Sequence, residues 1–126
     1  MIVAIDHVQL AMPPGGEDAA RRFYAGVLAL REVPKPAALA ARGGAWFESG
    51  PVRVHLGVEQ EFRPAVKAHP GFMVDDLGAL IRTAQEAGHR VVRDDAEAGM
   101  DRAYVFDPFG NRLELIQAPF RRPGPA

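Results

Sequence analysis

The sequence contains no cysteine. This absence excludes disulfide bonds, thiolate nucleophiles and thiolate metal ligands, so any bound metal ion needs nitrogen and oxygen ligands. The sequence also lacks an apolar run long enough to span a membrane, and its first residues have no basic segment of the kind that begins a secretory signal. We therefore expect a cytoplasmic location and no membrane partner.

An excess of charge of one sign is missing as well. The 15 basic and 16 acidic residues give a formal net charge of −1, and neither sign forms a long run. Such a balance gives no reason to expect a nucleic acid as partner. The 126 residues, 48% of them hydrophobic, suffice for a core, and we expect residues 1–126 to form a single domain.

Apolar spacing and turn residues predict the secondary structure of the first half. The expected elements are a strand at 2–11, a helix at 17–29, and strands at 30–34, 45–49 and 52–58. The helix has an apolar stripe formed by Ala20, Phe23, Tyr24, Val27 and Leu28. A polar connector that contains proline follows at 59–68.

The same order of elements recurs in the second half. The expected elements are a strand at 69–74, a helix at 77–87, and strands at 89–93, 102–107 and 112–117. Asp75 or Asp76 can cap the helix at its start, and Gly88 suits the position just after its end. The segment 107–111 reads Asp-Pro-Phe-Gly-Asn, which is a strong turn signal.

Each half therefore reads βαβββ, and the register matches as well as the order. Phe47 precedes His55 by 55 − 47 = 8 residues, and Phe106 precedes Glu114 by 114 − 106 = 8. An internal repeat of about 60 residues indicates a fold built from two copies of one unit. We predict an α+β fold with modules at about 1–58 and 69–118, and a flexible tail at 119–126.

Side chains alternate along a strand, so the parity of a position assigns its face. In 52–58, Val54 and Leu56 lie opposite His55, and in 112–117 the leucines lie opposite Glu114. In four strands an apolar face can pack on a helix while the other face carries one imidazole or carboxylate. These four residues are His7, His55, His69 and Glu114. Their shared face has too little bulk for an ordinary core and can line a concave cavity.

Imidazoles and a carboxylate suit a divalent metal ion, namely Fe, Mn, Ni, Co or Zn, and affinity alone does not choose among these ions. A single histidine on a strand is more often a surface residue than a ligand. Three of the four histidines in the chain nevertheless occupy equivalent places of the repeat. The fourth, His89, follows Gly88 in a loop, and we expect it to be an ordinary surface residue.

Several short motifs carry a resemblance to a known family. They are Asp6-His7-Val8 in the first strand, Arg22-Phe23-Tyr24 in the helix, Val74-Asp75-Asp76-Leu77, and the run Asp-Pro-Phe-Gly-Asn-Arg-Leu-Glu at 107–114. In this order and spacing, the chain resembles the vicinal oxygen chelate superfamily over nearly its whole length. That superfamily includes glyoxalase I, extradiol dioxygenases, methylmalonyl-CoA epimerase, and fosfomycin and bleomycin resistance proteins.

The resemblance implies two tandem βαβββ modules that form a cup-shaped mixed sheet with the helices on its outer face. It implies one divalent metal ion per site, held by the first and last strands of each module. Carried over to this sequence, the ligands are His7, His55, His69 and Glu114. Many small members complete the site across a homodimer, so a homodimer is expected here.

The function implied is that of a metal-dependent enzyme acting on a small substrate that chelates the metal through neighbouring oxygens, with lyase or isomerase chemistry favoured. Glu114 is then both a ligand and a candidate for proton transfer, and His55 is a fourth ligand or a general base. Glyoxalase I-like members usually have glutamate at the position of His55. This departure argues against glyoxalase I activity itself.

Two alternatives remain open. One is an Fe(II) extradiol-type dioxygenase with His7, His69 and Glu114 as its triad, although such enzymes resemble a doubled version of this chain. The other is a small-molecule binding or resistance protein for an antibiotic or an aromatic metabolite, although bleomycin resistance proteins generally lack this ligand set. By face parity alone, the candidates for contact with the substrate are Gln9, Arg53 and Tyr104, with weaker ones at Trp46, Phe47, Arg63 and Lys67.

Overall fold

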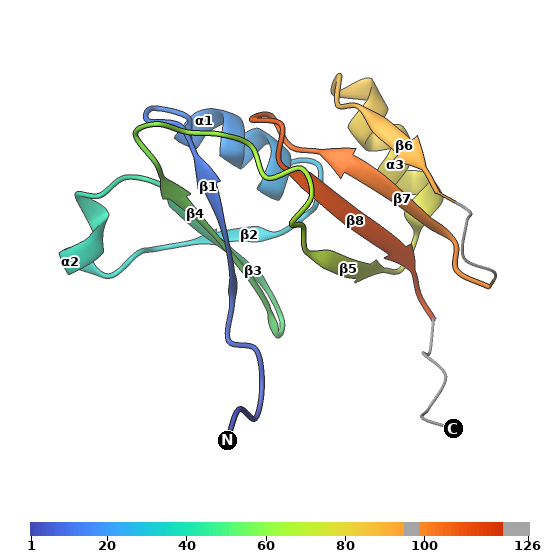
Figure 1. Ribbon diagram of the computed structural model, residues 1–126, viewed down its shortest axis with the longest axis horizontal. Coiled ribbons are helices and arrows are strands. Elements are labelled where there is room, and N and C mark those ends of the chain that lie inside the picture. The colour runs from blue at the N-terminus through green and yellow to red at the C-terminus, as the bar shows by residue number, and fades with distance from the viewer. Residues whose placement is uncertain (95–98, 120–126) are drawn as a thin grey trace.

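The structure is a computed structural model that describes residues 1–94 and 99–119. It consists of two modules, which lie at the left and the right of Figure 1. The first module contains β1 (Val8–Met12), α1 (Glu17–Ala20), η1 (Arg21–Ala25), β2 (Arg31–Val33), α2 (Ala37–Ala40), β3 (Ala45–Ser49) and β4 (Val52–Val58). The second contains β5 (Gly71–Val74), α3 (Leu77–Glu86), β6 (Val91–Arg93), β7 (Arg102–Phe106) and β8 (Arg112–Gln117).

Each module folds into a four-stranded mixed sheet. The strand orders are β1-β4-β3-β2 and β5-β8-β7-β6. β1 runs parallel to β4 and β5 runs parallel to β8, while the other neighbouring strands are antiparallel. The tandem βαβββ arrangement predicted from the repeat is therefore confirmed. Among the described residues, the strand that opens each module, β1 or β5, lies at the edge of its sheet and pairs with a single strand.

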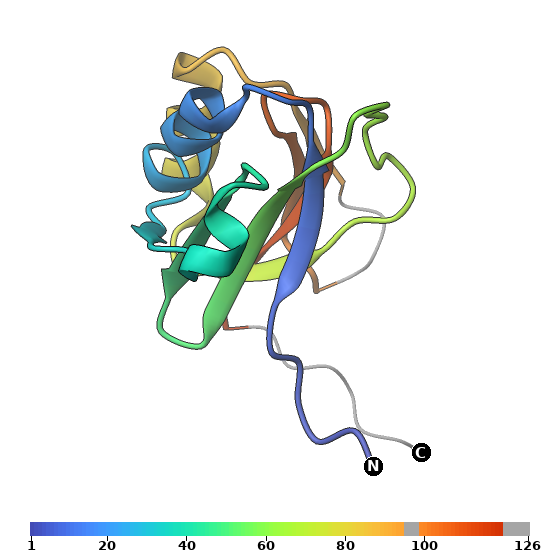
Figure 2. The same cartoon turned by 90° about the vertical axis from the view of Figure 1, so that its left-hand side faces the viewer.

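The core lies between the sheets and the helices. Figure 2 shows the helices of both modules on the same side of the sheets. The parity prediction holds for the apolar faces, since Val54, Leu56, Leu113 and Leu115 are all buried. The opposite faces of the two sheets, turned away from the helices, carry the polar residues that the sequence singled out. None of the helices in the described residues is long and apolar enough to cross a membrane.

The caps of α3 agree with the sequence. The Asp76 carboxylate accepts a hydrogen bond from the Ala79 backbone N–H at 3.0 Å, which satisfies one free N–H of the first turn. Gly88 follows the helix with φ +88°, a conformation that glycine adopts without strain.

The helix expected at 17–29 is shorter than predicted. After Ala20 the chain widens into a π-helical turn, in which Gly26 N–H donates to the Arg21 carbonyl and Leu28 N–H donates to the Phe23 carbonyl. Ala29 then takes φ +58° and ends the helical segment. The wider turn keeps both Phe23 and Tyr24 fully buried, and local apolar spacing cannot reveal such a change of helical period. The short helix α2 was not predicted either.

The strand expected at 2–11 begins only at Val8. Val8 pairs with Val54, so the register places Asp6 opposite Val52, where β4 begins. Positions before Asp6 therefore have no strand beside them within this chain. Residues 1–7 are exposed, with large apolar side chains at Met1, Ile2, Val3 and Ile5.

A buried polar cluster joins the two modules. Tyr24 donates its hydroxyl hydrogen to Asp107 Oδ2 at 2.7 Å, and Asn111 Nδ2 donates to the Ala11 carbonyl at 2.8 Å. Asn111 Oδ1 accepts from the backbone N–H of Ala65, in the connector, at 3.0 Å. The turn that the sequence predicted at 107–111 thus also binds the first module and the connector to the second module. Apart from Pro119, the predicted tail at 119–126 lies outside the described residues.

Candidate metal centre

His55 lies in the middle of β4 between two other rings. Trp46, opposite it on β3, stacks on its imidazole with ring centroids 3.9 Å apart and planes 3° from parallel, and His7 stacks at 4.2 Å. Burial, followed by the charge of His7, lowers the pKa of His55 from its ordinary value. His55 is therefore neutral at pH 7 and keeps a lone pair for a metal or a proton.

His7 lies just before β1 and is oriented by its neighbour. Its Nδ1 lies 3.0 Å from Asp6 Oδ2, and Arg53 Nη1 donates to Asp6 Oδ1 at 3.1 Å. The hydrogen bond with His7 is the largest cause of the lowered pKa of Asp6. With Nδ1 as the donor to a carboxylate, Nε2 carries the lone pair in the neutral form of His7, which is the usual arrangement of a histidine that binds a metal.

His69 and Glu114 form a second pair, in the other module. His69 Nε2 and Glu114 Oε1 are 3.2 Å apart, and His69 Nδ1 lies 2.8 Å from the Lys67 carbonyl oxygen. Because a carbonyl only accepts hydrogen bonds, Nδ1 is the donor, which makes Nε2 an acceptor in the neutral ring. In the doubly protonated ring Nε2 donates to Glu114 as an ion pair, whereas in the neutral ring two acceptors face each other and a metal ion between them would satisfy both. Two ligands at about 2.1 Å from one ion, at a right angle, lie about 3 Å apart, so this pair fits a metal ion.

Arg102 holds the other oxygen of Glu114. Its Nη1 donates to Glu114 Oε2 at 3.0 Å, and its Nη2 donates to Asp94 Oδ2 at 3.0 Å. Desolvation lowers the pKa of the Arg102 guanidinium, but the hydrogen bond that it donates to Glu114 and the nearby charges outweigh this effect and raise the pKa overall. Sequence reasoning missed Arg102. The signal was its parity, because Arg102 and Tyr104 lie on the face of β7 that Glu114 shares on β8.

The structure therefore brings the four predicted ligands together as two pairs. His7 and His55 belong to the first module, and His69 and Glu114 to the second. Within residues 1–94 and 99–119, no three histidine, aspartate or glutamate side chains converge closely enough to hold a metal ion. We refer to the two pairs as half-sites, each with two candidate ligands.

Comparison with known proteins identifies the family. Residues 11–116 match the family model described as a glyoxalase-like domain. The chain belongs to the glyoxalase-like domain family. This family lies within the vicinal oxygen chelate superfamily, as the sequence motifs predicted.

Solved structures share the glyoxalase-like fold. A protein from Bacillus anthracis assigned to the glyoxalase family is 44% identical, with a TM-score of 0.88 over 93% of this chain and 96% of that chain. A glyoxalase/dioxygenase from Nostoc punctiforme is 21% identical, with a TM-score of 0.74 over 95% and 98%. The fosfomycin resistance protein FosX from Listeria monocytogenes is 12% identical, with a TM-score of 0.75 over 95% and 97%. The last two show the fold alone. No curated protein matches the chain.

The candidate substrate residues of this glyoxalase-like domain differ in their surroundings. Gln9 pairs with His55 in the sheet, and its side chain lies over Gly57, where a Cβ would come within 2.6 Å of it. Arg53 forms an ion pair with Asp6, the residue next to His7. Tyr104 lies opposite Glu114, and its ring meets that of His69 edge-on at 5.5 Å.

The weaker candidates fall outside the two half-sites, except for Trp46. Phe47 is fully buried and belongs to the core. The side chains of Arg63 and Lys67 are exposed on the connector. His89 is not an ordinary surface residue as expected, because it is half-buried and its ring packs edge-on against Phe23 at 4.6 Å.

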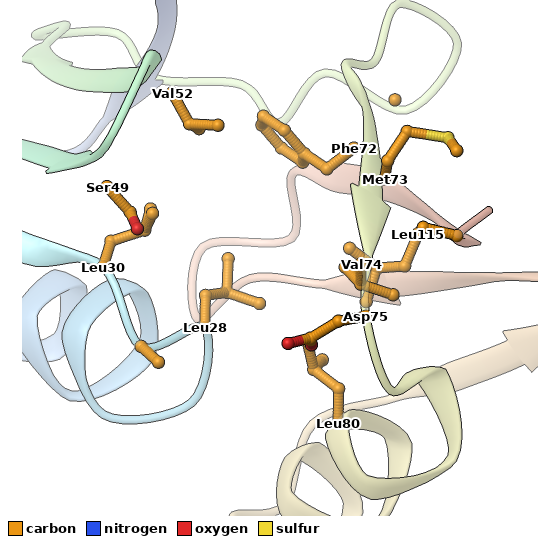
Figure 3. A pocket seen from close by; sticks show the side chains of 13 residues that line it. Leu28, Leu30, Ser49, Val52, Phe72, Met73, Val74, Asp75, Leu80 and Leu115 are labelled. Carbon is orange, nitrogen blue, oxygen red and sulfur yellow. The ribbon is translucent and has the colours of Figure 1, made fainter. Parts of the chain in front are cut away.

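An apolar groove of about 670 Å³ lies between the modules, and none of the four candidate ligands is among its lining residues. Figure 3 shows Leu28, Leu30 and Val52 on one side of it and residues of β5 and α3 on the other. Sequence reasoning did not find the groove, because its two walls come from different modules. The exposed side chains of Val52 and Met73 lie at its rim, next to the free edge of β5.

Proposed function

We propose that this glyoxalase-like domain is a metal-dependent enzyme that acts on a small substrate chelating the metal through neighbouring oxygens, with lyase or isomerase chemistry. The ligands in this proposal are His7, His55, His69 and Glu114. The observation that carries it is the 3.2 Å approach of His69 Nε2 to Glu114 Oε1, because two ligands of one metal ion lie at about this separation.

The proposal includes a homodimer in which the first module of one copy faces the second module of the other. Three features support it. The two ligand pairs do not meet within one chain, the edges of β1 and β5 are unpaired, and apolar side chains are exposed at the N-terminus and along β5. An unpaired edge beside exposed apolar residues is a surface on which strands of another chain can pair.

When bound, the metal ion acts as a Lewis acid on the substrate oxygens. The protein side chains then have separate tasks. Arg102 fixes Glu114 through Oε2, which leaves Oε1 directed at His69 and available to bind or to accept a proton. His55, held neutral by burial, is a ligand or a general base. Gln9 and Tyr104 lie beside the ligand pairs and are candidates to contact the substrate.

Metal analysis of untagged protein, purified without chelator, tests the proposal. We expect close to one equivalent of Fe, Mn, Ni, Co or Zn per site in the native protein. The variants His69→Ala and Glu114→Ala should lose it, whereas the control His89→Gln, which changes the one histidine outside the two pairs, should keep it. Circular dichroism verifies that each variant is folded. A native protein that takes up none of these ions would refute the enzyme function.

A second candidate function is small-molecule binding without chemistry. The apolar groove of about 670 Å³ favours it, since it has the size of ordinary ligand pockets. This candidate would be supported if the native protein contained no metal and bound an aromatic probe such as anilinonaphthalene sulfonate. The variant Val52→Glu should then no longer bind the probe. Oxygen consumption with a catechol under Fe(II) would instead replace lyase or isomerase chemistry with dioxygenation.

A further inference from the structure

Arginine side chains pack over two aromatic rings of the second sheet. The guanidinium of Arg112 lies 3.8 Å from the ring centroid of Tyr104, and that of Arg90 lies 4.7 Å from the ring centroid of Phe106. Phe106 is directly opposite Arg112 in the β7–β8 ladder. Both rings lie on the face turned away from the helices, which is also the face of Glu114.

Of the three arginines Arg90, Arg102 and Arg112, one is paired with carboxylates of the described residues and two are not. Arg102 is engaged by Glu114 and Asp94. Arg90 and Arg112, in contrast, have no carboxylate within ion-pair distance in the described part of the chain. The protein as a whole has a net charge of −1, so this local excess is not a consequence of a basic composition.

Arg112 is held in place and still has a donor to offer. Its Nη1 donates to the Val66 carbonyl at 3.1 Å, and its backbone N–H donates to the Ala65 carbonyl at 2.9 Å. Stacking on Tyr104 fixes the plane of the guanidinium. Its Nε is buried and out of reach of a ligand, whereas its Nη2 donates to no residue that the structure describes. An ordered arginine with an unused donor is suited to bind an oxyanion in a fixed orientation.

We propose that Arg112, assisted by the charge of Arg90, forms a subsite for an oxyanionic group, either a carboxylate or a phosphate or phosphonate. Arg112 and Glu114 are two residues apart on the same face of β8, a distance of about 7 Å along a strand. A small acid can therefore reach from the His69–Glu114 pair to Arg112. The anion binding stands by itself, whereas its place beside metal-chelating oxygens rests on the function proposed above. If the anion subsite and the metal centre bind the same molecule, the substrate is a small oxygenated acid.

Anion titrations of the metal-free protein test the subsite. Inorganic phosphate, methylphosphonate and acetate are added after removal of metals with a chelator, and NMR follows the Nε–H signals of the arginines. We expect the Arg112 signal to shift and saturate. Arg112→Gln should weaken phosphate binding at least about 10-fold, because a charge-assisted hydrogen bond is lost. Arg112→Lys should be intermediate, since an ammonium lacks the planar fork.

Two further variants separate anion binding from folding. Arg90→Gln removes a charge without touching the connector and should weaken phosphate binding several-fold. Arg93→Gln is the control, because Arg93 is exposed and paired with Asp101 at 3.3 Å on the same module. It should bind phosphate like the native protein.

The outcomes distinguish the subsite from the metal centre. Equal phosphate affinity in native protein and Arg112→Gln, or no binding at all, would overturn the subsite. Binding that appears only after a metal is added would place the anion on the metal and also overturn it, while leaving the metal centre intact. Binding in a protein that takes up no metal would support the subsite and refute the metal centre. Tighter binding of phosphate and methylphosphonate than of acetate identifies a tetrahedral anion, and the reverse identifies a carboxylate.

Discussion

Asn111 joins three parts of the chain, and its replacement tests how the two modules are held together. The side chain is 1% exposed. It donates to the Ala11 carbonyl at 2.8 Å and to Asp107 Oδ2 at 2.9 Å, and it accepts from Ala65 N–H at 3.0 Å. Asn111→Ala removes all three hydrogen bonds and leaves their partners in place.

The expected loss follows from the partners left without hydrogen bonds. A buried polar group that loses its partner costs about 1–3 kcal/mol. The Ala65 N–H is only partly buried and can form a hydrogen bond with water instead. Asp107 keeps the hydrogen bond that it accepts from Tyr24. We therefore expect Asn111→Ala to lower the free energy of unfolding by about 2–4 kcal/mol, a large share of the stability of a domain of this size.

Urea unfolding followed by circular dichroism measures this loss, and a double-mutant cycle assigns it to the cluster. Tyr24→Phe removes one hydroxyl bond to the same oxygen of Asp107 and should cost about 1–2 kcal/mol alone. Because both side chains bond to Asp107 Oδ2, the two losses should be non-additive by at least about 0.5 kcal/mol. A loss below about 1 kcal/mol for Asn111→Ala, or strict additivity, would contradict the view that this cluster joins the modules.

Three further predictions concern pH, backbone geometry and the dimer. Burial, followed by the charge of the Asp107 carboxylate, raises the pKa of Tyr24 well above 10. Above pH 10 the unfolded chain therefore releases a proton that the native protein retains. The free energy of unfolding should then fall by up to about 1.4 kcal/mol per pH unit, and Tyr24→Phe should flatten this loss in urea titrations at pH 9–11. Gly44 has φ +84°, and a Cβ there would lie 2.1 Å from a carbonyl oxygen of β4, so Gly44→Ala should cost more than about 2 kcal/mol in thermal unfolding. Gly50→Ala, at φ +56° with open space around it, should cost only about 1 kcal/mol, and equal losses would refute the steric argument. If the proposed metal site spans two copies, refolding equal amounts of His7→Ala and Glu114→Ala together should restore about a quarter of the native metal content, because half of the dimers are mixed and each has one intact site. No restoration by metal analysis would exclude a shared site.

Local sequence patterns determined most of the secondary structure and the faces of the strands. The strands at 45–49, 52–58 and 112–117 have the predicted bounds, and Val54, Leu56, Leu113 and Leu115, assigned to the helix side, are buried, whereas Val52 is exposed. This works because the alternation of side chains along a strand and the conformations of turn residues depend on neighbours in the sequence. The 60-residue repeat extended the same local information to the whole fold. It also selected the four candidate ligands.

Only the tertiary structure decided how these residues meet. The contact of His69 with Glu114 spans 45 residues, and the contact of Arg102 with Glu114 depends on the register of β7 and β8. The packing of the two modules decides three features. These are the separation of the candidate ligands into two pairs, the apolar groove, and the buried polar cluster around Asn111. Sequence periodicity fixes which face a side chain occupies, but it contains no information on which faces of distant segments come into contact, since that is set by the packing of the whole chain.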